Sequence, residues 1–410
     1  MREMKDSGVA WIGEIPETWE TMPVKNVFEI TRGRVIAKTE IEEEARKNYY
    51  PVYSSQTANN GVLGYIQTFD YSVDSLTWTT DGAKAGTVFL RRGKYSITNV
   101  CGILTPKTSE QCLEFLHYTV SYSAFNCRRA DINGYKIMSN EMAIIPIVLP
   151  PISTQQKIAA HLDRKCTQID ALISNAQQQI EKLKAYKQSV ITETVTKGLD
   201  PDVEMKNSGV EWIGGMPEHW EVAPIRSLFR IKKDIIGHEP DTVLSITQGG
   251  IKVKDINENS GQMANSYAHY QIVNIGDFAM NHMDLLTGGI GISEFEGVTS
   301  PDYRVFVMRN ADMNPRYFLY VFQMYYRNKI FYAFGQGAAN LGRWRLPAQN
   351  FNTVAVPLSP VEEQNSIVTF LDEKCTQIDQ LIALKQQKIE KLQQYKKSLI
   401  YEYVTGKKEV

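Results

Sequence analysis

A long internal duplication is the feature that most constrains how this chain of 410 residues can fold. Residues 4–20 recur at 205–221, at an offset of 201 residues. Residues 165–183 recur at 374–392 with an identical Lys-Cys-Thr-Gln-Ile-Asp string, at an offset of 209. Because self-similarity of this kind marks a repeated structural unit, the sequence predicts two tandem units of one design.

The segments between the repeated blocks, residues 23–149 and 224–358, share little sequence. Both mix β-branched and aromatic runs with Gly and Asn turns, which is typical of short strands. Each also contains a segment of helical composition, Glu114 to Phe125 in the first and Pro315 to Phe334 in the second. We therefore expect similar frames to hold two dissimilar α+β inserts with mixed, curved β-sheets.

The second repeated block predicts a long helix in each unit, beginning after Pro151 and after Pro360. Ser153 or Thr154 is placed to cap the first helix, and Glu362 with its acidic neighbour suits the first turn of the second. Apolar residues at alternating spacings of three and four form a narrow heptad seam. The seam residues are Ile169, Ile173, Ile180, Leu183 and Val190, and Ile378, Ile382, Ile389, Leu392 and Leu399.

Such a narrow apolar stripe needs a partner helix, and the simplest partner is the second copy in the same chain. We expect an antiparallel coiled coil between the inserts, and hence a pseudo-two-fold internal repeat. Lys187, Lys385 and Lys396 interrupt the seam. The alternative is two independent amphipathic helices, each packed on its own domain or on another protein.

These features predict four parts of the chain. They are a first domain at 1–150, a first helix at 151–200, a second domain at 201–359 and a second helix at 360–410, with the repeat segments 4–20 and 205–221 inside the two domains.

Composition excludes several classes of protein. The five cysteines include no C-x-x-C pair, which argues against a disulfide framework and against a zinc ribbon. The longest apolar stretch, Met142 to Leu149, contains Pro146 and is too short to span a bilayer. A start with charges of both signs favours a cytoplasmic protein without a signal peptide. The net charge of −1 means that any DNA contact depends on local patches or on basic partners.

Arg, Lys, Asn and Gln in the expected loops are candidates for DNA contact, because Arg can pair with guanine and Asn or Gln with adenine. Aromatic residues between Tyr317 and Phe334 more often face a core, so we expect them to be structural. The candidates are Asn59, Asn60, Lys84, Arg91, Arg92, Arg128, Arg129, Asn133, Lys136, Lys252, Lys254, Gln336, Asn340, Arg343 and Arg345.

The usual signatures of catalysis are absent from the sequence. There is no G-x-x-x-x-G-K-[ST] phosphate loop, no H-E-x-x-H metal motif and no Asn-Pro-Pro-Tyr type motif for methylation of a base amino group. The six histidines form no ligand-spaced set. The chain is therefore expected to have no catalytic or metal-binding residues of its own.

Several strings have a form seen together in one family. They are Trp11-Ile12-Gly13 with Pro16 and Trp19, Leu149-Pro150-Pro151 to Gln155-Gln156, its second copy Val356 to Pro360 with Gln364, and Gly82 to Gly86 leading to Ile97-Thr98-Asn99-Val100. Over essentially its whole length the chain resembles the specificity subunits of type I restriction-modification systems.

The resemblance implies two target-recognition domains held apart by two conserved helices, each domain reading one half of a bipartite site in double-stranded DNA. It also implies that two methyltransferase subunits dock on the helical region and that restriction-translocase subunits join for cleavage in defence against phage. S-adenosylmethionine, ATP and magnesium are then expected on the partners and no cofactor on this chain.

One expectation comes from the sequence itself. Because the inserts differ, the half-sites should differ and the full target should not be palindromic. Two other classes remain open: a coiled-coil scaffold with two protein-binding domains, and a stand-alone nuclease or methyltransferase, which the absent motifs disfavour.

Overall fold

The computed structural model describes residues 2–132, 134–255, 264–337 and 344–410. The chain forms two compact units. Unit 1 comprises Met1–Gln177 and Gln386–Val410, and unit 2 comprises Gln178–Lys385. Each unit therefore holds one insert together with part of each long helix. No helix in the described ranges is long and apolar enough to cross a membrane.

The centre of unit 1 is a four-stranded antiparallel sheet of order β4-β11-β7-β9. Two small strand pairs, β1-β2 and β3-β14, come from the repeated frame, and two three-stranded sheets, β10-β5-β6 and β12-β13-β8, lie beyond the centre. The strands are β1 (Met4–Asp6), β2 (Glu14–Pro16), β3 (Glu20–Pro23), β4 (Phe28–Arg32), β5 (Tyr50–Tyr53), β6 (Val62–Ile66), β7 (Ser75–Thr79), β8 (Asp81–Gly82), β9 (Val88–Arg91), β10 (Ser96–Ile97), β11 (Cys101–Pro106), β12 (Arg129–Asp131), β13 (Gly134–Lys136) and β14 (Pro146–Leu149).

Unit 2 repeats the central sheet with the order β18-β25-β22-β23, again antiparallel. Its outer strands differ, because they form two separate pairs, β19-β20 and β21-β24. The strands are β15 (Met205–Asn207), β16 (Gly215–Pro217), β17 (Glu221–Pro224), β18 (Phe229–Lys232), β19 (Leu244–Thr247), β20 (Gly250–Val253), β21 (Gln271–Val273), β22 (Phe278–Met280), β23 (Ile290–Ile292), β24 (Gly297–Thr299), β25 (Arg304–Met308) and β26 (Ala355–Leu358).

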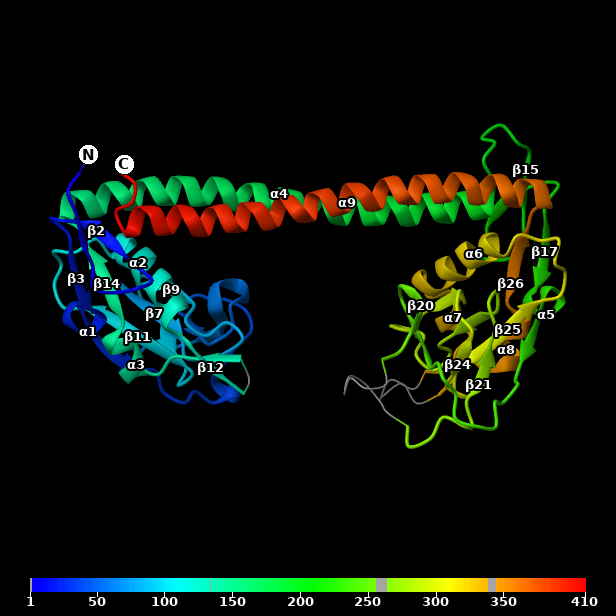
Figure 1. The fold of residues 1–410 in the computed structure, drawn as a ribbon, viewed down its shortest axis with the longest axis horizontal. Helices are drawn as coiled ribbons and strands as arrows, with labels where there is room; N and C mark the ends of the chain where they lie inside the picture. Colours follow the sequence, from blue (N-terminus) through cyan, green and yellow to red (C-terminus); the bar gives the residue numbers. More distant parts are fainter. Residues whose placement is uncertain (1, 133, 256–263, 338–343) are drawn as a thin grey trace. The chain divides into compact units, whose positions relative to one another are not determined.

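Helices pack on each central sheet and join it to the long helices. In unit 1 the buried cluster that includes Leu76 of the sheet and Phe115 of α2 also takes in Leu162 of α4 and Leu399 of α9. Figure 1 shows α2 and α6 lying between their sheets and the long helices. The shorter helices are α1 (Val24–Val27), η1 (Lys38–Glu40), η2 (Ala58–Gly61), α2 (Leu113–Cys127), α3 (Ser139–Ile144), α5 (Ile225–Leu228), α6 (Pro315–Arg327), α7 (Ile330–Ala333) and α8 (Ala348–Thr353).

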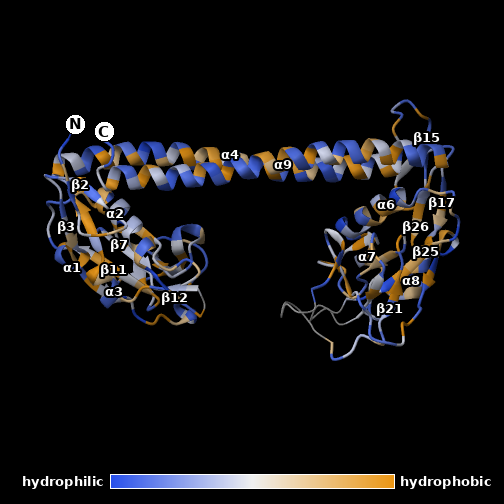
Figure 2. Ribbon diagram, in the orientation of Figure 1, coloured by the Kyte–Doolittle hydropathy of each residue, from blue (hydrophilic) through white to orange (hydrophobic). Residues whose placement is uncertain are grey.

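The long helices α4 (Ile152–Lys197) and α9 (Val361–Val404) each contribute to both units. In unit 1 the beginning of α4 packs against the end of α9, and in unit 2 the end of α4 packs against the beginning of α9. The helices are therefore antiparallel within each unit, as predicted. All ten predicted seam residues are buried or half-buried. Apolar and polar residues alternate along both helices in Figure 2, which is typical of such a seam.

The structure changes two details of the predicted helices. Helix α4 begins at Ile152, so Ser153 and Thr154 lie inside its first turn and the predicted cap is wrong. The predicted helix from Pro315 to Phe334 is two helices, because Lys329 adopts a left-handed conformation with φ of 59° between α6 and α7. Helix α4 ends before Gly198, whose φ of 78° suits the turn that follows a helix.

Candidate nucleic-acid interface

Arg91, a predicted DNA contact, is one of the most deeply buried side chains of unit 1. It ends β9 and is 1% exposed. Its guanidinium carbon lies 3.5 Å from the centre of the Tyr53 ring, Nε donates to Thr77 Oγ1 at 2.9 Å, and Nη1 donates to the Asn60 carbonyl at 2.8 Å. Burial lowers the pKa of Arg91 to about 10, so it remains charged at neutral pH. The side chain is an internal support, so the prediction that Arg91 contacts DNA directly is wrong.

Asn59 and Asn60 are exposed in η2, the loop between β5 and β6. Their φ angles are 47° and 51°, in the left-handed region that Asn tolerates better than most residues. Among the described residues neither side-chain amide has a hydrogen-bond partner. Both amides are therefore free to make polar contacts with a ligand.

The hairpin β12-β13 forms a second protrusion of unit 1. Arg128 at its base stacks between two rings, 4.0 Å from the centre of Phe125 and 3.9 Å from that of Tyr135. Near the tip, the side chain of Ile132 is 98% exposed. Gly134 allows the hairpin to approach the β8 turn, because a Cβ there would lie 2.9 Å from Ala83. Asn133, another predicted contact, lies outside the described residues.

Most other candidate cations of unit 1 face carboxylates. Pairing with a carboxylate reduces the availability of these cations for phosphate. Lys84 differs, because it is exposed in the turn after β8 and has no ion-pair partner in the part of the chain that the structure describes. The pairs are Arg92 with Asp74 and Glu114, Arg129 with Glu141, and Lys136 with Asp131.

In unit 2 the candidates lie on two different segments. Lys252 is exposed on β20 and Lys254 is half-buried just after it. Gln336 and Arg345 are exposed and joined by two backbone hydrogen bonds of 2.8 and 3.1 Å. This bridge brackets a segment that includes Asn340 and Arg343, which lie outside the described residues. The bridge follows the domain helices of unit 2, as the hairpin β12-β13 follows α2 in unit 1.

Buried basic groups also gather beneath this bridge. Arg304 is 5% exposed, its Nη2 donates to the Leu346 carbonyl at 2.7 Å, and its Nη1 is unsatisfied within the described part of the chain. Burial, reinforced by the charges of Arg304 and Arg345, lowers the pKa of His282 to about 3. His282 is therefore neutral at physiological pH.

Each central domain is fixed to the long helices by the same tyrosine contact. In unit 1 the Tyr118 hydroxyl donates to Asp163 at 2.7 Å, and in unit 2 the Tyr320 hydroxyl donates to Asp372 at the same distance. Burial and these hydrogen bonds raise the pKa of both tyrosines. Both hydroxyls therefore stay protonated and act as donors, so the contact is repeated chemically as well as in sequence.

Two buried glutamines make a second repeated contact. The side-chain oxygen of Gln155 accepts from the backbone N–H of Cys112 at 3.0 Å, and that of Gln364 accepts from Asn314 at 2.9 Å. Both residues lie in the first turn of a long helix. These bonds set the angle at which each domain helix begins against its long helix.

Beside these contacts each unit has a groove where its domain helix meets the long helices. The groove of unit 1 has a volume of about 450 Å³ and includes Phe125, whereas that of unit 2 has about 390 Å³ and includes Arg327. In unit 1, Lys397 Nζ lies 4.2 Å from the centre of the Phe125 ring. In unit 2, Arg327 donates a hydrogen bond to the side chain of Gln188 at 3.4 Å. Equivalent places thus use different side-chain chemistry.

The lysines that interrupt the predicted seam pair across it. Lys187 Nζ lies 2.7 Å from Asp379 in unit 2, and Lys396 Nζ lies 2.7 Å from Asp170 in unit 1. The two pairs correspond at an offset of 209 with the helices exchanged. Lys385 donates to Gln179. The interruptions are therefore polar contacts that fix the antiparallel register.

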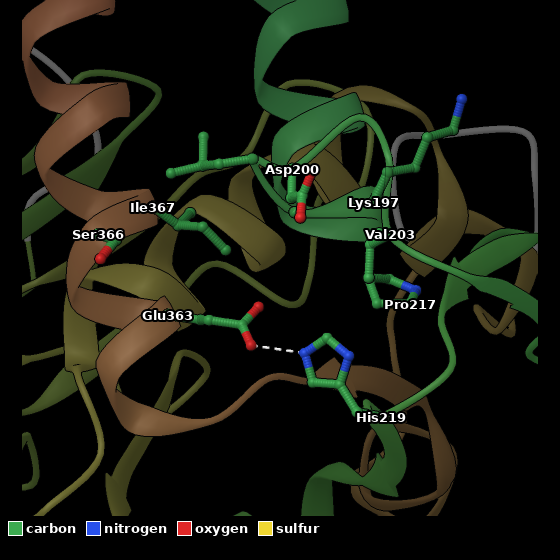
Figure 3. A pocket seen from close by; sticks show the side chains of 10 residues that line it. Lys197, Asp200, Val203, Pro217, His219, Glu363, Ser366 and Ile367 are labelled. Carbon is green, nitrogen blue, oxygen red and sulfur yellow. Dashed lines mark hydrogen bonds and ion pairs between the residues drawn. The ribbon is translucent and has the colours of Figure 1, made fainter.

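Figure 3 shows a small pocket of unit 2 where α4 ends and α9 begins. Its volume is about 220 Å³. His219 and Glu363 face each other across it, with Nε2 and Oε1 2.5 Å apart, and Trp220 donates to the other oxygen of Glu363 at 2.8 Å. These bonds tie the repeated frame to α9. In the described ranges no group of three His, Cys, Asp or Glu side chains is placed to hold a metal ion.

Sequence reasoning missed several exposed apolar side chains outside the seam, among them two repeated pairs of Leu and Tyr. Leu172 and Tyr395 are exposed in unit 1, and their copies at an offset of 209, Leu381 and Tyr186, are exposed in unit 2. The register set by the ion pairs places each Leu at nearly the same level as the Tyr of the other helix. Their repetition was the signal that marks them, because exposed apolar side chains retained twice at matching positions indicate a repeated contact surface.

Comparison with known proteins identifies the family. The profile of the type I restriction modification DNA specificity domain matches residues 16–183. The N-terminus of the putative type I specificity subunit S.MpnORF289P from Mycoplasma pneumoniae is 40% identical over 144 residues. The match covers 35% of this chain and 76% of that protein. A second M. pneumoniae subunit, S.MpnORF201P, is 38% identical, and the match covers 34% of this chain and 58% of that protein.

Two further proteins match almost the whole chain. The putative type I restriction enzyme MjaX specificity subunit of Methanocaldococcus jannaschii is 24% identical over 97% of this chain and 95% of its own length. A solved structure, described as the structural basis of complex assembly and conformational transition of the type I R-M system, has a TM-score of 0.65 at 12% identity. It covers 96% of this chain and 99% of its own. The similarity to this solved structure shows that the two proteins share a fold.

Two sheet domains of one topology, each fixed by repeated contacts to paired long helices, define a tandem-domain recognition protein. The chain belongs to the type I restriction-modification specificity subunits. The general role of this family is recognition of a DNA target, and its members are non-catalytic.

Proposed function

We propose that this chain reads a bipartite, asymmetric target in double-stranded DNA and directs methyltransferase and restriction subunits to it. The observation that carries the proposal is the pairing of one central sheet order with two different sets of outer strands. Similar scaffolds give both domains the same mounting, and different outer elements give them different contact surfaces. The half-sites should therefore differ, and the full site should not be palindromic.

The outer elements carry the chemistry that such reading requires. In unit 1 they present the free amides of Asn59 and Asn60 together with exposed Lys84, and in unit 2 they present Lys252 and Arg345. Amides and guanidinium groups read base edges, while lysines neutralise phosphates. With a net charge of −1, the chain lacks a large positive field, so much of the affinity for DNA should come from its partners.

The repeated pairs Leu172 with Tyr395 and Leu381 with Tyr186 support docking of two methyltransferase subunits, one on each unit. They occupy heptad positions on the other side of the seam from Asp163 and its copy, which the domain helices contact. Restriction subunits would join this complex in the cytoplasm. S-adenosylmethionine, ATP and magnesium would be bound by the partners.

The test is to co-express the chain with the methyltransferase subunit from its own locus and to map methylated adenines in the host DNA. A split, asymmetric motif that requires this chain supports the proposal. Unchanged methylation despite a stable complex would support a protein-binding scaffold instead. Replacing residues 23–149 by the insert of a relative should change one half-site only, and a simultaneous change in both halves contradicts the modular arrangement.

Docking is tested separately by Leu172→Arg combined with Leu381→Arg. Both side chains are exposed, so the variant should fold normally but lose one or both methyltransferase subunits in analytical ultracentrifugation. Ser174→Arg is the matched control, because Ser174 is exposed on α4 but outside the pair. Wild-type stoichiometry in the double variant would contradict docking at this surface.

A further inference from the structure

The buried guanidinium of Arg91 and the exposed amides of η2 are two ends of one device in unit 1. Loop η2 connects β5 to β6, and its base is closed where the Ser54 N–H donates to the Gly61 carbonyl at 2.9 Å. Beyond that closure, Arg91 reaches the loop from β9 and binds the Asn60 carbonyl. The loop is therefore held by Arg91 of the central sheet in addition to its own internal hydrogen bonds.

The conformation of the loop needs this support. Asn59, Asn60 and Gly61 are three consecutive residues with positive φ, of 47°, 51° and 78°. A left-handed non-glycine residue is unfavourable and persists only where its surroundings enforce it. Gly61 also has to lack a side chain, because a Cβ would lie 2.9 Å from Arg91 Nη2. The guanidinium and the loop backbone are therefore fitted to each other.

Burying the Arg91 guanidinium costs desolvation free energy, so packing alone does not explain why an arginine occupies this position. It is 1% exposed and has no carboxylate partner within the described residues. Its charge is held by the Tyr53 and Phe89 rings, at 3.5 and 4.4 Å, and by hydrogen bonds to a hydroxyl and a carbonyl. An apolar residue would fill the space without the desolvation cost of a cation. What an apolar residue cannot do is fix a loop carbonyl.

The device is confined to one unit. The strand registers align Leu76 and Leu90 with Phe278 and Ile292, so that the position of Arg91 in β9 corresponds to Ser293 after β23. Ser293 is buried and donates to the nearby Phe295 carbonyl. Unit 2 therefore has a short side chain at this position, and its nearby buried cation, Lys232, pairs with Asp277 instead of a loop carbonyl. Whatever the η2 loop recognises therefore belongs to one half of the target.

We propose that η2 is a base-reading loop in which Asn59 and Asn60 contact an adenine edge in one half-site, and that Arg91 is the positioning residue that holds them there. The inference rests on the proposed function. Asn pairs with adenine by accepting from N6 and donating to N7, a bidentate contact that tolerates little movement of the amide. Holding the backbone of Asn60 from a buried guanidinium reduces that movement before DNA arrives.

Adenine methylation by the full chain with its methyltransferase subunit tests the device. Asn59→Gly and Asn60→Gly remove the amides without strain, since glycine accepts positive φ. Arg91→Lys keeps the charge but not the fork that binds Thr77 and Asn60 together. Asn60→Gly and Arg91→Lys are each expected to relax discrimination at the same base position by about tenfold or more, leaving the other half-site and the gap unchanged.

The triple variant Arg91→Lys with Asn59→Gly and Asn60→Gly separates positioning from general stability. If Arg91 acts only by positioning the two amides, the triple variant discriminates no worse than the double variant Asn59→Gly with Asn60→Gly, because residues acting as a unit are not additive. Arg92→Lys is the control, since it makes the same change at the next residue, which is exposed and paired with acids. Equal loss at both half-sites in Arg91→Lys would overturn the positioning role.

The glycine variants decide the reading role even if Arg91→Lys does not fold. A methylated motif identical to wild type at every position in both glycine variants overturns the inference while leaving the proposed function standing. A wild-type complex that methylates no split motif overturns the proposed function, and the inference with it.

Discussion

At one equivalent position of the two central sheets, unit 1 has Gly102 and unit 2 has Arg304. Gly102 lies under Trp78, and a Cβ there would be 2.0 Å from the indole ring. Arg304 instead spreads its guanidinium over Phe351 at 4.7 Å. The same ladder of strands is therefore filled by different combinations of side chains, which explains how inserts of unlike sequence keep one strand order.

The comparison extends outward from the sheets. The frame repeats its contacts almost unchanged, as Tyr118 with Asp163 and Tyr320 with Asp372 show. The core conserves shape but not residues, and the outer strands conserve neither. The outer strands differ most between the units, as expected if the helices hold shared partners while the outer elements determine the target.

The largest effect should come from a buried ion pair that, among the described residues, only unit 2 contains. Lys232 Nζ lies 2.7 Å from Asp277, and both side chains are less than 10% exposed. Lys232→Met leaves a buried carboxylate unpaired, so unit 2 should lose about 3–5 kcal/mol of unfolding free energy. Hydrogen exchange measured by mass spectrometry would locate the loss in unit 2. In Lys232→Met with Asp277→Leu much of the stability should return, and a double variant as unstable as the single one would contradict this account.

The packing of Gly102 predicts the next effect, in unit 1. Gly102→Ala puts a methyl group against Trp78, which is fully buried and held by its N–H bond to the Ile137 carbonyl at 3.1 Å. Overpacking of this kind should cost about 1–3 kcal/mol in denaturant unfolding. Gly215→Ala is the control in unit 2, since its nearest neighbour would be 3.8 Å away. Equal stability of the two variants would show that the indole moves freely.

Acidification should destabilise unit 2 through His282, and unit 1 through His117, whose pKa burial also lowers. The pKa of His282 is lowered to about 3 in the folded protein, below the ordinary value of about 6.5. Between these values the unfolded chain binds more protons, so stability decreases as the pH is lowered through this window. The loss at pH 5 should be at most about 2 kcal/mol. His282→Asn should flatten the pH dependence of the unfolding midpoint, and an unchanged slope would assign it to other groups.

The smallest effects should be the most alike. Lys187→Ala and Lys396→Ala each remove one of two equivalent cross-helix pairs whose acidic partners are more than half exposed. Each should cost less than about 1 kcal/mol, with the difference from wild type shrinking in high salt. Urea titrations at two salt concentrations measure this. A large loss for one lysine and none for the other would show that the two pairs are not equivalent.

The sequence predicted the frame of this protein well, because repetition and heptad spacing depend on local periodicity. The ten seam residues and the structural role of the aromatic residues of α6 were both predicted. The aromatic prediction holds for Tyr317 and Tyr325, which are buried. The start of α4 and the break at Lys329 were not, since helix ends depend on contacts beyond the local pattern.

The candidate contacts were less predictable, because a charged residue in a loop has no pattern that reveals its burial. Arg91 and Arg92 are neighbours in the sequence, yet one is 1% exposed and the other lies on the surface between two acids. Nothing in the sequence distinguished them. The strand geometry of β9 did, by turning successive side chains to opposite faces of the sheet.

By itself the sequence determined that the chain has two units of one design, which differ in their inserts and each contain a long helix with an apolar stripe. Repeats and apolar periodicity can be read directly along the chain. Only the tertiary structure decided that the unlike inserts share one sheet order, that Lys187 and Lys396 bind carboxylates across the seam, and that Arg91 faces inward to hold the Asn59–Asn60 loop. These features depend on contacts between residues that are distant in the sequence, and only such contacts determine which side chains are buried and which are paired.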